Sequence, residues 1–127
     1  MRNSILIALL FLTSITSCTS DNELSQEEEA QNLRELFSEI ENLALSVDCE
    51  NAAEWSFTGY GIKACGGPIG FIAYSVNIDV DLFLELIEEH REKQRAFNKK
   101  WGISSDCSVP TQPAGVICQN GSPVLDY

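Results

Sequence analysis

Cysteine is the residue type in this 127-residue chain that can take part in the most kinds of chemistry. The chain has five: Cys18, Cys49, Cys65, Cys107 and Cys118. The last four follow one another at intervals of 16, 42 and 11 residues, so none forms the C-x-x-C pair of zinc and thioredoxin-like redox sites. We therefore expect no metal site and no cofactor. Four cysteines can instead pair completely as two disulfide bonds, which form in oxidising compartments.

The single histidine, His90, is the other candidate for chemistry, as a general base. A base of this kind acts on a nucleophile, but the chain has no G-x-S-x-G motif, and four cysteines are assigned to disulfides. We therefore predict a structural role for His90 on a helix flank, no catalytic residues and no enzymatic activity.

Two further segments resemble ligand-binding loops only in part. The acidic spacing of residues 77–88 matches an EF-hand calcium loop, but the position that such a loop reserves for glycine is Leu82. In the glycine-rich segment 59–70, neither 59–61 nor 66–70 has the lysine, the serine or the strand-to-helix context of a phosphate-binding loop. Helix capping and tight turns are the better interpretations of the two segments.

Residues 1–17 have the pattern of an export signal, with Arg2 before an apolar run of eight residues at 5–12 and a small, polar stretch at 13–17. A membrane-spanning helix needs about 20 apolar residues, so this run predicts a cleaved leader. Ile15-Thr16-Ser17-Cys18 resembles the lipobox of bacterial lipoproteins, which implies that Cys18 is acylated after cleavage.

Lipidation of Cys18 also leaves an even number of cysteines for disulfide pairing. The alternative is an ordinary secretory signal, with Cys18 as a spare thiol. Residues 18–24 then form a short acidic tether, and residues 25–127 form one domain.

The mature chain is strongly acidic, because the leader holds one of the eight bases and none of the nineteen acids, leaving 7 − 19 = −12 charges. Nucleic acids are bound by neutralising phosphates with Lys and Arg, so this balance excludes them as partners. It also repels anionic lipid surfaces, so we expect membrane attachment only through the lipid on Cys18.

Two amphipathic helices are predicted. Ser25 begins the first, with a capping-box glutamate at position 28, and the apolar stripe runs at three- and four-residue steps to Val47. The second is capped within 77–81 and stops at Gly102. Its predicted buried side consists of Val80, Phe83, Leu84, Ile87, Gln94, Phe97 and Trp101.

Two β-hairpins are also predicted. Aromatic and β-branched residues of 55–62 and 71–76 flank the turn residues Gly66-Gly67-Pro68. Residues 116–127 form a closing hairpin with Asn120-Gly121 in the turn, where Pro123 requires an edge strand. The fold class is therefore α+β: a small antiparallel sheet made of a central and a C-terminal hairpin, covered by two helices and held by two disulfides.

The central hairpin also predicts the disulfide pairing. Its first strand separates Cys49 from Cys65 by on the order of 30 Å, whereas bridged α-carbons lie within about 7 Å. The second helix returns the chain so that Cys107 arrives near Cys65, and Cys118 then reaches Cys49. We predict disulfides Cys65–Cys107 and Cys49–Cys118.

The segments 55–74 and 96–107, with the closing Cys118 segment, resemble a family of small bacterial lipoproteins of Bacteroidota type that share ACGGP and a Ser-Asp-Cys segment. This resemblance implies a cell-envelope location, lipid-anchored in the outer membrane and facing the periplasm or the surface, and no assigned activity. We expect a non-enzymatic binding module with an unknown protein partner. The alternative is a protease inhibitor that presents a disulfide-braced loop, either 66–70 or 108–115.

Overall fold

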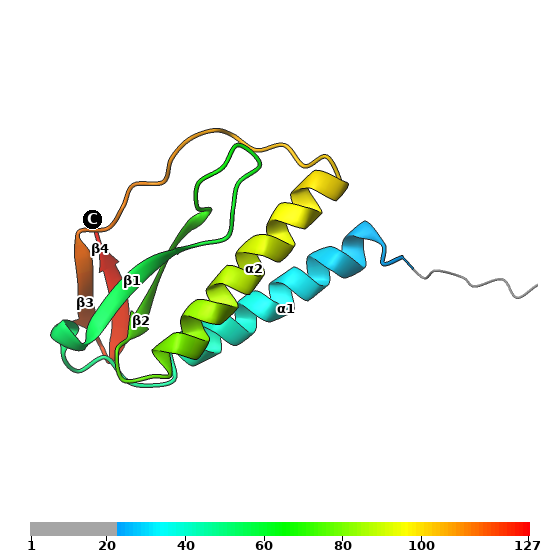
Figure 1. Ribbon diagram of the computed structural model, residues 1–127. Coiled ribbons are helices and arrows are strands. Elements are labelled where there is room, and N and C mark those ends of the chain that lie inside the picture. Colours follow the sequence, from blue (N-terminus) through cyan, green and yellow to red (C-terminus); the bar gives the residue numbers. More distant parts are fainter. Residues whose placement is uncertain (1–22) are drawn as a thin grey trace, which may run out of the picture.

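The computed structural model describes residues 23–127 (Figure 1). The predicted export signal, the lipobox with Cys18 and most of the acidic tether lie outside these residues. The elements follow in the order α1 (Gln26–Ala44), a short 3-10 helix η1 (Ala52–Glu54), β1 (Trp55–Tyr60), β2 (Gly70–Ser75), α2 (Val80–Lys100), β3 (Gly115–Gln119) and β4 (Ser122–Asp126). The α+β class with two helices, two antiparallel hairpins and two disulfides is confirmed.

Both helices begin at the predicted caps. The Ser25 hydroxyl accepts a hydrogen bond from the Glu28 amide at 3.3 Å, and the Glu28 carboxylate accepts one from the Ser25 amide at 2.8 Å, which completes the capping box. The Asp79 carboxylate caps α2 by accepting from the Leu82 amide at 3.0 Å. The helix α1 ends at Ala44, three residues before the predicted Val47, which is exposed.

The hairpins pair in separate two-stranded sheets, with Trp55 opposite Ser75 in β1–β2 and Gly115 opposite Asp126 in β3–β4. The strand β1 is shorter than predicted and ends at Tyr60 rather than at residue 62. The strand β2 ends at Ser75. The next amide, of Val76, still donates in register with the ladder, to the Glu54 carbonyl of η1 at 2.8 Å. Both residues of the predicted closing turn have positive φ, 52° at Asn120 and 78° at Gly121, as a tight hairpin turn requires.

The hairpin β1–β2 is the middle layer of the molecule and lies between the two helices and the hairpin β3–β4 (Figure 1). Its alternating side chains reach a core on each side. On one face, Tyr60, Ile72 and Tyr74 pack on the buried helix residues, which are Ile40, Ala44, Phe83 and Ile87. On the other face, Trp55 and Ala73 pack with Cys49 and with side chains of β3–β4, namely Val116, Cys118 and Leu125. Of the predicted buried stripe on α2, Leu84 is exposed, and His90 takes a buried place instead.

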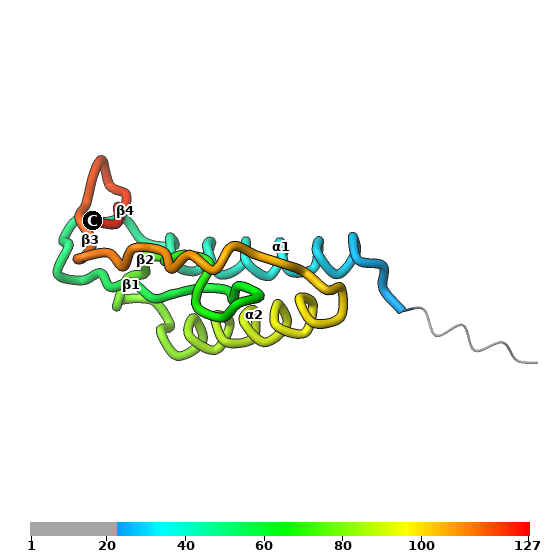
Figure 2. Tube along the Cα trace, turned by 90° about the horizontal axis from the view of Figure 1, so that it is seen from above, coloured from blue at the N-terminus to red at the C-terminus, as the bar shows by residue number. Residues whose placement is uncertain are grey.

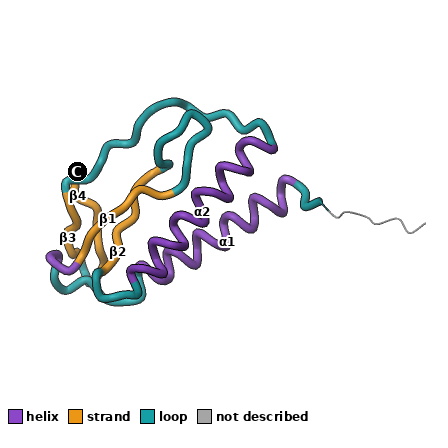
Figure 3. The backbone as a smooth tube through the Cα atoms, in the orientation of Figure 1, coloured by secondary structure: helices purple, strands orange, loops and turns teal. Residues whose placement is uncertain are grey.

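A long connection without helix or strand joins α2 to β3, and we call its residues 103–114 the strap (Figure 3). Seen from above in Figure 2, the strap runs along the length of the molecule beside β1–β2. Its two ends are fixed by backbone hydrogen bonds, from the Ile103 amide to the Asn98 carbonyl at 3.0 Å and from the Ala114 amide to the Asp126 carbonyl at 2.7 Å.

Replacing Phe83 with alanine should lower the free energy of unfolding by about 3–5 kcal/mol, because the fully buried ring lies where α2 meets α1 and the Tyr74 ring. The matched control is Leu84→Ala on the same helix, whose side chain is 40% exposed and should cost less than about 1 kcal/mol. Urea denaturation followed by circular dichroism measures both. Equal losses for the two variants would contradict the assigned core.

Candidate functional site

The two disulfides fix opposite ends of the central hairpin. Cys49 is joined to Cys118 with α-carbons 5.3 Å apart, and Cys65 to Cys107 with α-carbons 5.5 Å apart, which is the predicted pairing. Cys49 is buried beside Trp55 at the base of the hairpin, whereas Cys65 and Cys107 are exposed near its tip. One bond therefore belongs to a core, and the other fastens the strap to the loop between β1 and β2.

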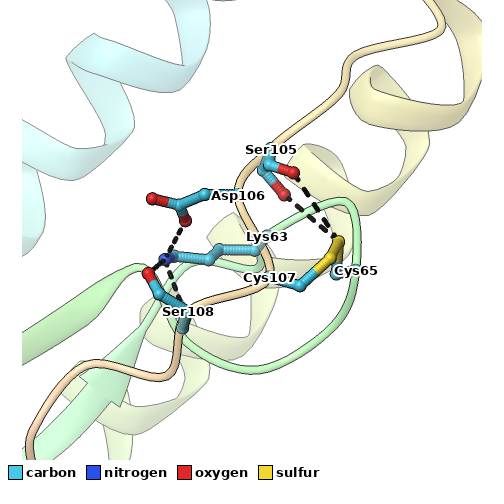
Figure 4. The surroundings of a disulfide bond; sticks show 6 residues. All are labelled: Lys63, Cys65, Ser105, Asp106, Cys107 and Ser108. Atoms are coloured by element: carbon cyan, nitrogen blue, oxygen red, sulfur yellow. Dashed lines mark hydrogen bonds and ion pairs between the residues drawn. A yellow bond between two sulfur atoms is a disulfide. The ribbon is translucent and has the colours of Figure 1, made fainter.

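A lysine reinforces the second disulfide (Figure 4). The Lys63 ammonium donates to the Asp106 carboxylate at 2.7 Å, to the Ser108 carbonyl at 2.8 Å and to the Ser108 hydroxyl at 3.2 Å. The Ser105 hydroxyl also donates to the Cys65 sulfur at a distance of 3.9 Å. These contacts join the hairpin loop to residues 105–108 of the strap on both sides of Cys107.

The contacts of Lys63 also define what it can do chemically. The hydrogen bond from Lys63 lowers the pKa of Asp106, so this carboxylate stays ionised and holds the ammonium. An ammonium whose three protons are donated has no lone pair with which to deprotonate Ser108. Although Lys63 and Ser108 have the residue types of a catalytic dyad, their geometry is that of a brace.

Sequence reasoning missed Lys63, although one signal was present. It is the one Lys or Arg between Arg34 and Arg91, and it lies two positions before a disulfide cysteine. A single cation in so acidic a stretch indicates an ion pair, but its partners lie 43 and 45 residues away, which the sequence does not reveal.

The strap forms one wall of an open cavity of about 550 Å³, which we call the hollow. The hairpin β3–β4 covers the Trp55 and Ala73 end of the outer face of β1–β2, and Gly59 and Phe71 at the other end line the hollow. Its lining combines the hairpin and its loop with α2 and the strap: Gly59, Gly61, Ile62, Gly67, Pro68, Phe71, Arg91, Arg95, Val109, Pro110 and Gln112.

Glycine is required at one point of this lining. Gly61 has φ +64°, and a side chain there would place its Cβ 2.6 Å from the Gln94 Oε1 atom. The same Gln94 oxygen accepts from the Ile62 amide at 3.0 Å, and the Asn98 side-chain amide donates to the Ile62 carbonyl at 3.0 Å. These bonds hold the chain against α2 after Tyr60 and explain why β1 ends before residue 62.

His90 lines a different cavity, of about 370 Å³, between α1, α2 and the hairpin loop. Its side chain is 5% exposed and packs on the Phe37 ring at 5.4 Å between centroids, and its Nδ1 atom has no hydrogen-bond partner among residues 23–127. Burial lowers the pKa of His90, and the nearby Leu33 carbonyl opposes this shift. The described contacts bring no serine, threonine or cysteine side chain to this imidazole.

The residues that partly match a calcium-binding loop instead make contacts within α2 and at its cap. Asp79 caps the helix, and the Glu88 carboxylate accepts from the Arg91 guanidinium at 2.9 Å. Within residues 23–127, no group of three or more His, Cys, Asp or Glu side chains is placed to hold a metal ion. None of the helices in this range is both long enough and apolar enough to cross a bilayer.

Comparisons with protein-family models, with curated proteins and with solved structures found no match to this chain.

The stability of the protein should fall on acidification in a way that depends on His90. Its pKa is lowered by burial below the ordinary 6.5, so the unfolded state binds more protons once the pH drops through that value. Above pH 6.5 the imidazole is neutral in both states, and the free energy of unfolding is not reduced by His90. As the pH falls from 6.5 toward the folded-state pKa, protonation of His90 in the unfolded state lowers the free energy of unfolding. His90→Gln should therefore lose less stability than the native protein between pH 7.5 and pH 5.

Urea denaturation at the two pH values measures this difference. Every carboxylate is common to the two proteins, so their titration cancels in the comparison. Equal losses of stability would show that His90 is not held in its neutral form by the fold.

Proposed function

We propose that this chain is a lipid-anchored lipoprotein of the cell envelope, related to the small Bacteroidota-type lipoproteins that share its ACGGP and Ser-Asp-Cys segments. In this proposal it acts as a non-enzymatic binding module, and the hollow is its binding surface. It sits in the outer membrane, facing the periplasm or the surface, and recognises a protein partner.

Cysteine pairing supports the anchored location. Four of the five cysteines are joined in disulfides, which favours an oxidising compartment, and Cys18 is the one that remains for another role. It ends the lipobox-like Ile15-Thr16-Ser17-Cys18 and lies seven residues before the cap of α1. Seven residues span at most about 25 Å, so an acyl chain on Cys18 would hold the folded part close to the membrane.

The observation that carries the binding function is the hollow between the hairpin face and the braced strap. Ligand sites are typically concavities of about 300–1,000 Å³ with an apolar lining and a few polar groups, and the hollow has this size and composition. The disulfide Cys65–Cys107 and the Lys63 brace fix its wall before any ligand arrives. A preformed wall lowers the entropy cost of binding.

One observation favours protease inhibition as a second candidate. The side chain of Val109 is 83% exposed and stands two residues after the disulfide-bonded Cys107, on a segment that Lys63 also holds. A rigid loop with an exposed aliphatic side chain has the form that a protease cleft with a small hydrophobic pocket accepts.

Photo-crosslinking in living bacteria tests the binding function at the hollow. A photoreactive amino acid replaces Val109 at the rim of the hollow or Glu39 on the exposed face of α1, in otherwise identical full-length chains. We expect a discrete adduct from position 109 only, and labelling by an alkyne fatty acid that Cys18→Ala abolishes. Equal adducts at both positions, or an unlabelled soluble protein, would contradict the proposal.

The purified native chain is also titrated against an elastase-type protease. Stoichiometric inhibition that Val109→Asp abolishes would replace the binding module with the inhibitor. No inhibition is expected.

A further inference from the structure

We infer that the hollow takes an extended peptide segment that carries carboxylates at alternate positions, which bind to Arg91 and Arg95. The inference rests on the proposed function, because it names the ligand of that same surface. Three features support it: the sign of the charge, the availability of the two guanidinium groups and their spacing.

The charge of the hollow is opposite to that of the chain. Acids outnumber bases by 19 to 8 in the whole sequence, yet the charged residues that line the hollow are Arg91 and Arg95, and no carboxylate lines it. A neighbouring cavity of about 330 Å³ shares Ile62 and Arg95 with the hollow and adds Lys63 and Lys99, again without an acid. Lys63 is already paired with Asp106, but every charged residue that lines either cavity is a cation, which complements an anionic ligand.

Both arginines can exchange their present partners for a ligand. Arg91 bonds to Glu88 at 2.9 Å and Arg95 to Glu92 at 3.3 Å, both as pairs three residues apart on the surface of α2. Exposed pairs of this kind contribute little to stability, so a better-placed carboxylate can replace them. A guanidinium binds a carboxylate through two parallel N–H groups, which a single helix neighbour does not satisfy.

The spacing of the arginines selects an extended chain. Four residues of α-helix rise by about 6 Å, which separates Arg91 from Arg95 along the axis of α2. Two residues of an extended peptide span about 6.6 Å, and their side chains point to the same side. Carboxylates at alternate positions therefore match the arginines, and the intervening side chain can contact the apolar lining at Pro68 and Phe71.

Other polyanions fit less well. Nucleic acid is repelled by the net charge of the whole chain, −11. A bilayer surface is flat and does not enter a concavity walled by the strap. A polyuronate has the carboxylates but no apolar side chain for Phe71, Val109 and the two prolines, and it serves as the competing probe.

Binding is measured by fluorescence anisotropy, with the full-length protein in non-ionic detergent and three labelled hexapeptides. The first has glutamates at its third and fifth positions, the second has the same residues with the glutamates adjacent, and the third has glutamines in their place. We expect the first to bind at least fivefold more tightly than the second and tenfold more tightly than the third. Raising the salt concentration should weaken it.

Variants of the protein assign this preference to α2. The double variant Arg91→Ala with Arg95→Ala should lose at least tenfold in affinity, and Arg91→Lys with Arg95→Lys should lose less, because charge remains but the two-pronged geometry does not. The matched control is Lys93→Ala, an exposed cation of the same helix that bonds to Glu89 and lines neither cavity. It should bind as the native protein does. Circular dichroism and disulfide mapping confirm that each variant folds.

Equal affinity for the three peptides, or full affinity in the double alanine variant, would overturn the inference. Tighter binding of polygalacturonate than of any peptide would overturn it in favour of a glycan. A position-109 adduct without binding of any peptide would leave the proposed function standing and reject only this ligand class. Absence of both would reject the two together.

Discussion

The structure depends on the need to cover both faces of one short hairpin. A two-stranded ribbon such as β1–β2 is marginal in water, because each of its faces leaves apolar side chains exposed. The helices cover the face with Tyr60, Ile72 and Tyr74, and the hairpin β3–β4 covers the Trp55 end of the other face. The closing hairpin is too short to reach the tip, so the strap lies beside the uncovered end and forms one wall of the hollow there.

Covalent bonds compensate for the small cores that this arrangement allows. The disulfides close segments of 42 and 69 residues, for which the chain-entropy account gives about 4 kcal/mol of stabilisation each. Their positions matter as much as their energy. Cys49–Cys118 joins the closing hairpin to the base of β1–β2, while Cys65–Cys107 holds a strap that has no ladder of its own. The base of the hairpin is therefore held by a packed core, and its tip is held by the disulfide to the strap. The hollow lies at the tip.

Features with local signals were predictable from the sequence, and features made by distant partners were not. The capping box at Ser25, the turn at Asn120-Gly121 and the disulfide pairing each follow from short-range chemistry or from the length of a strand. The apolar stripe runs past the end of α1, where Ser46 donates to the Leu43 carbonyl. The strand β1 stops early because Gln94 and Asn98, more than 30 residues away, bind the Ile62 backbone. The hollow needs the Lys63 brace and the strap together, so no single segment indicates it.

The disulfide Cys65–Cys107 holds the strap in place and so keeps the hollow formed. Limited proteolysis by proteinase K, with the native chain and with Cys65→Ala/Cys107→Ala, tests it most directly. We expect the native strap to resist and the variant to be cut first within 103–112, giving two pieces that Cys49–Cys118 keeps together until reduction. A variant strap that resists as the native one does, or cleavage throughout the variant at once, would contradict the claim.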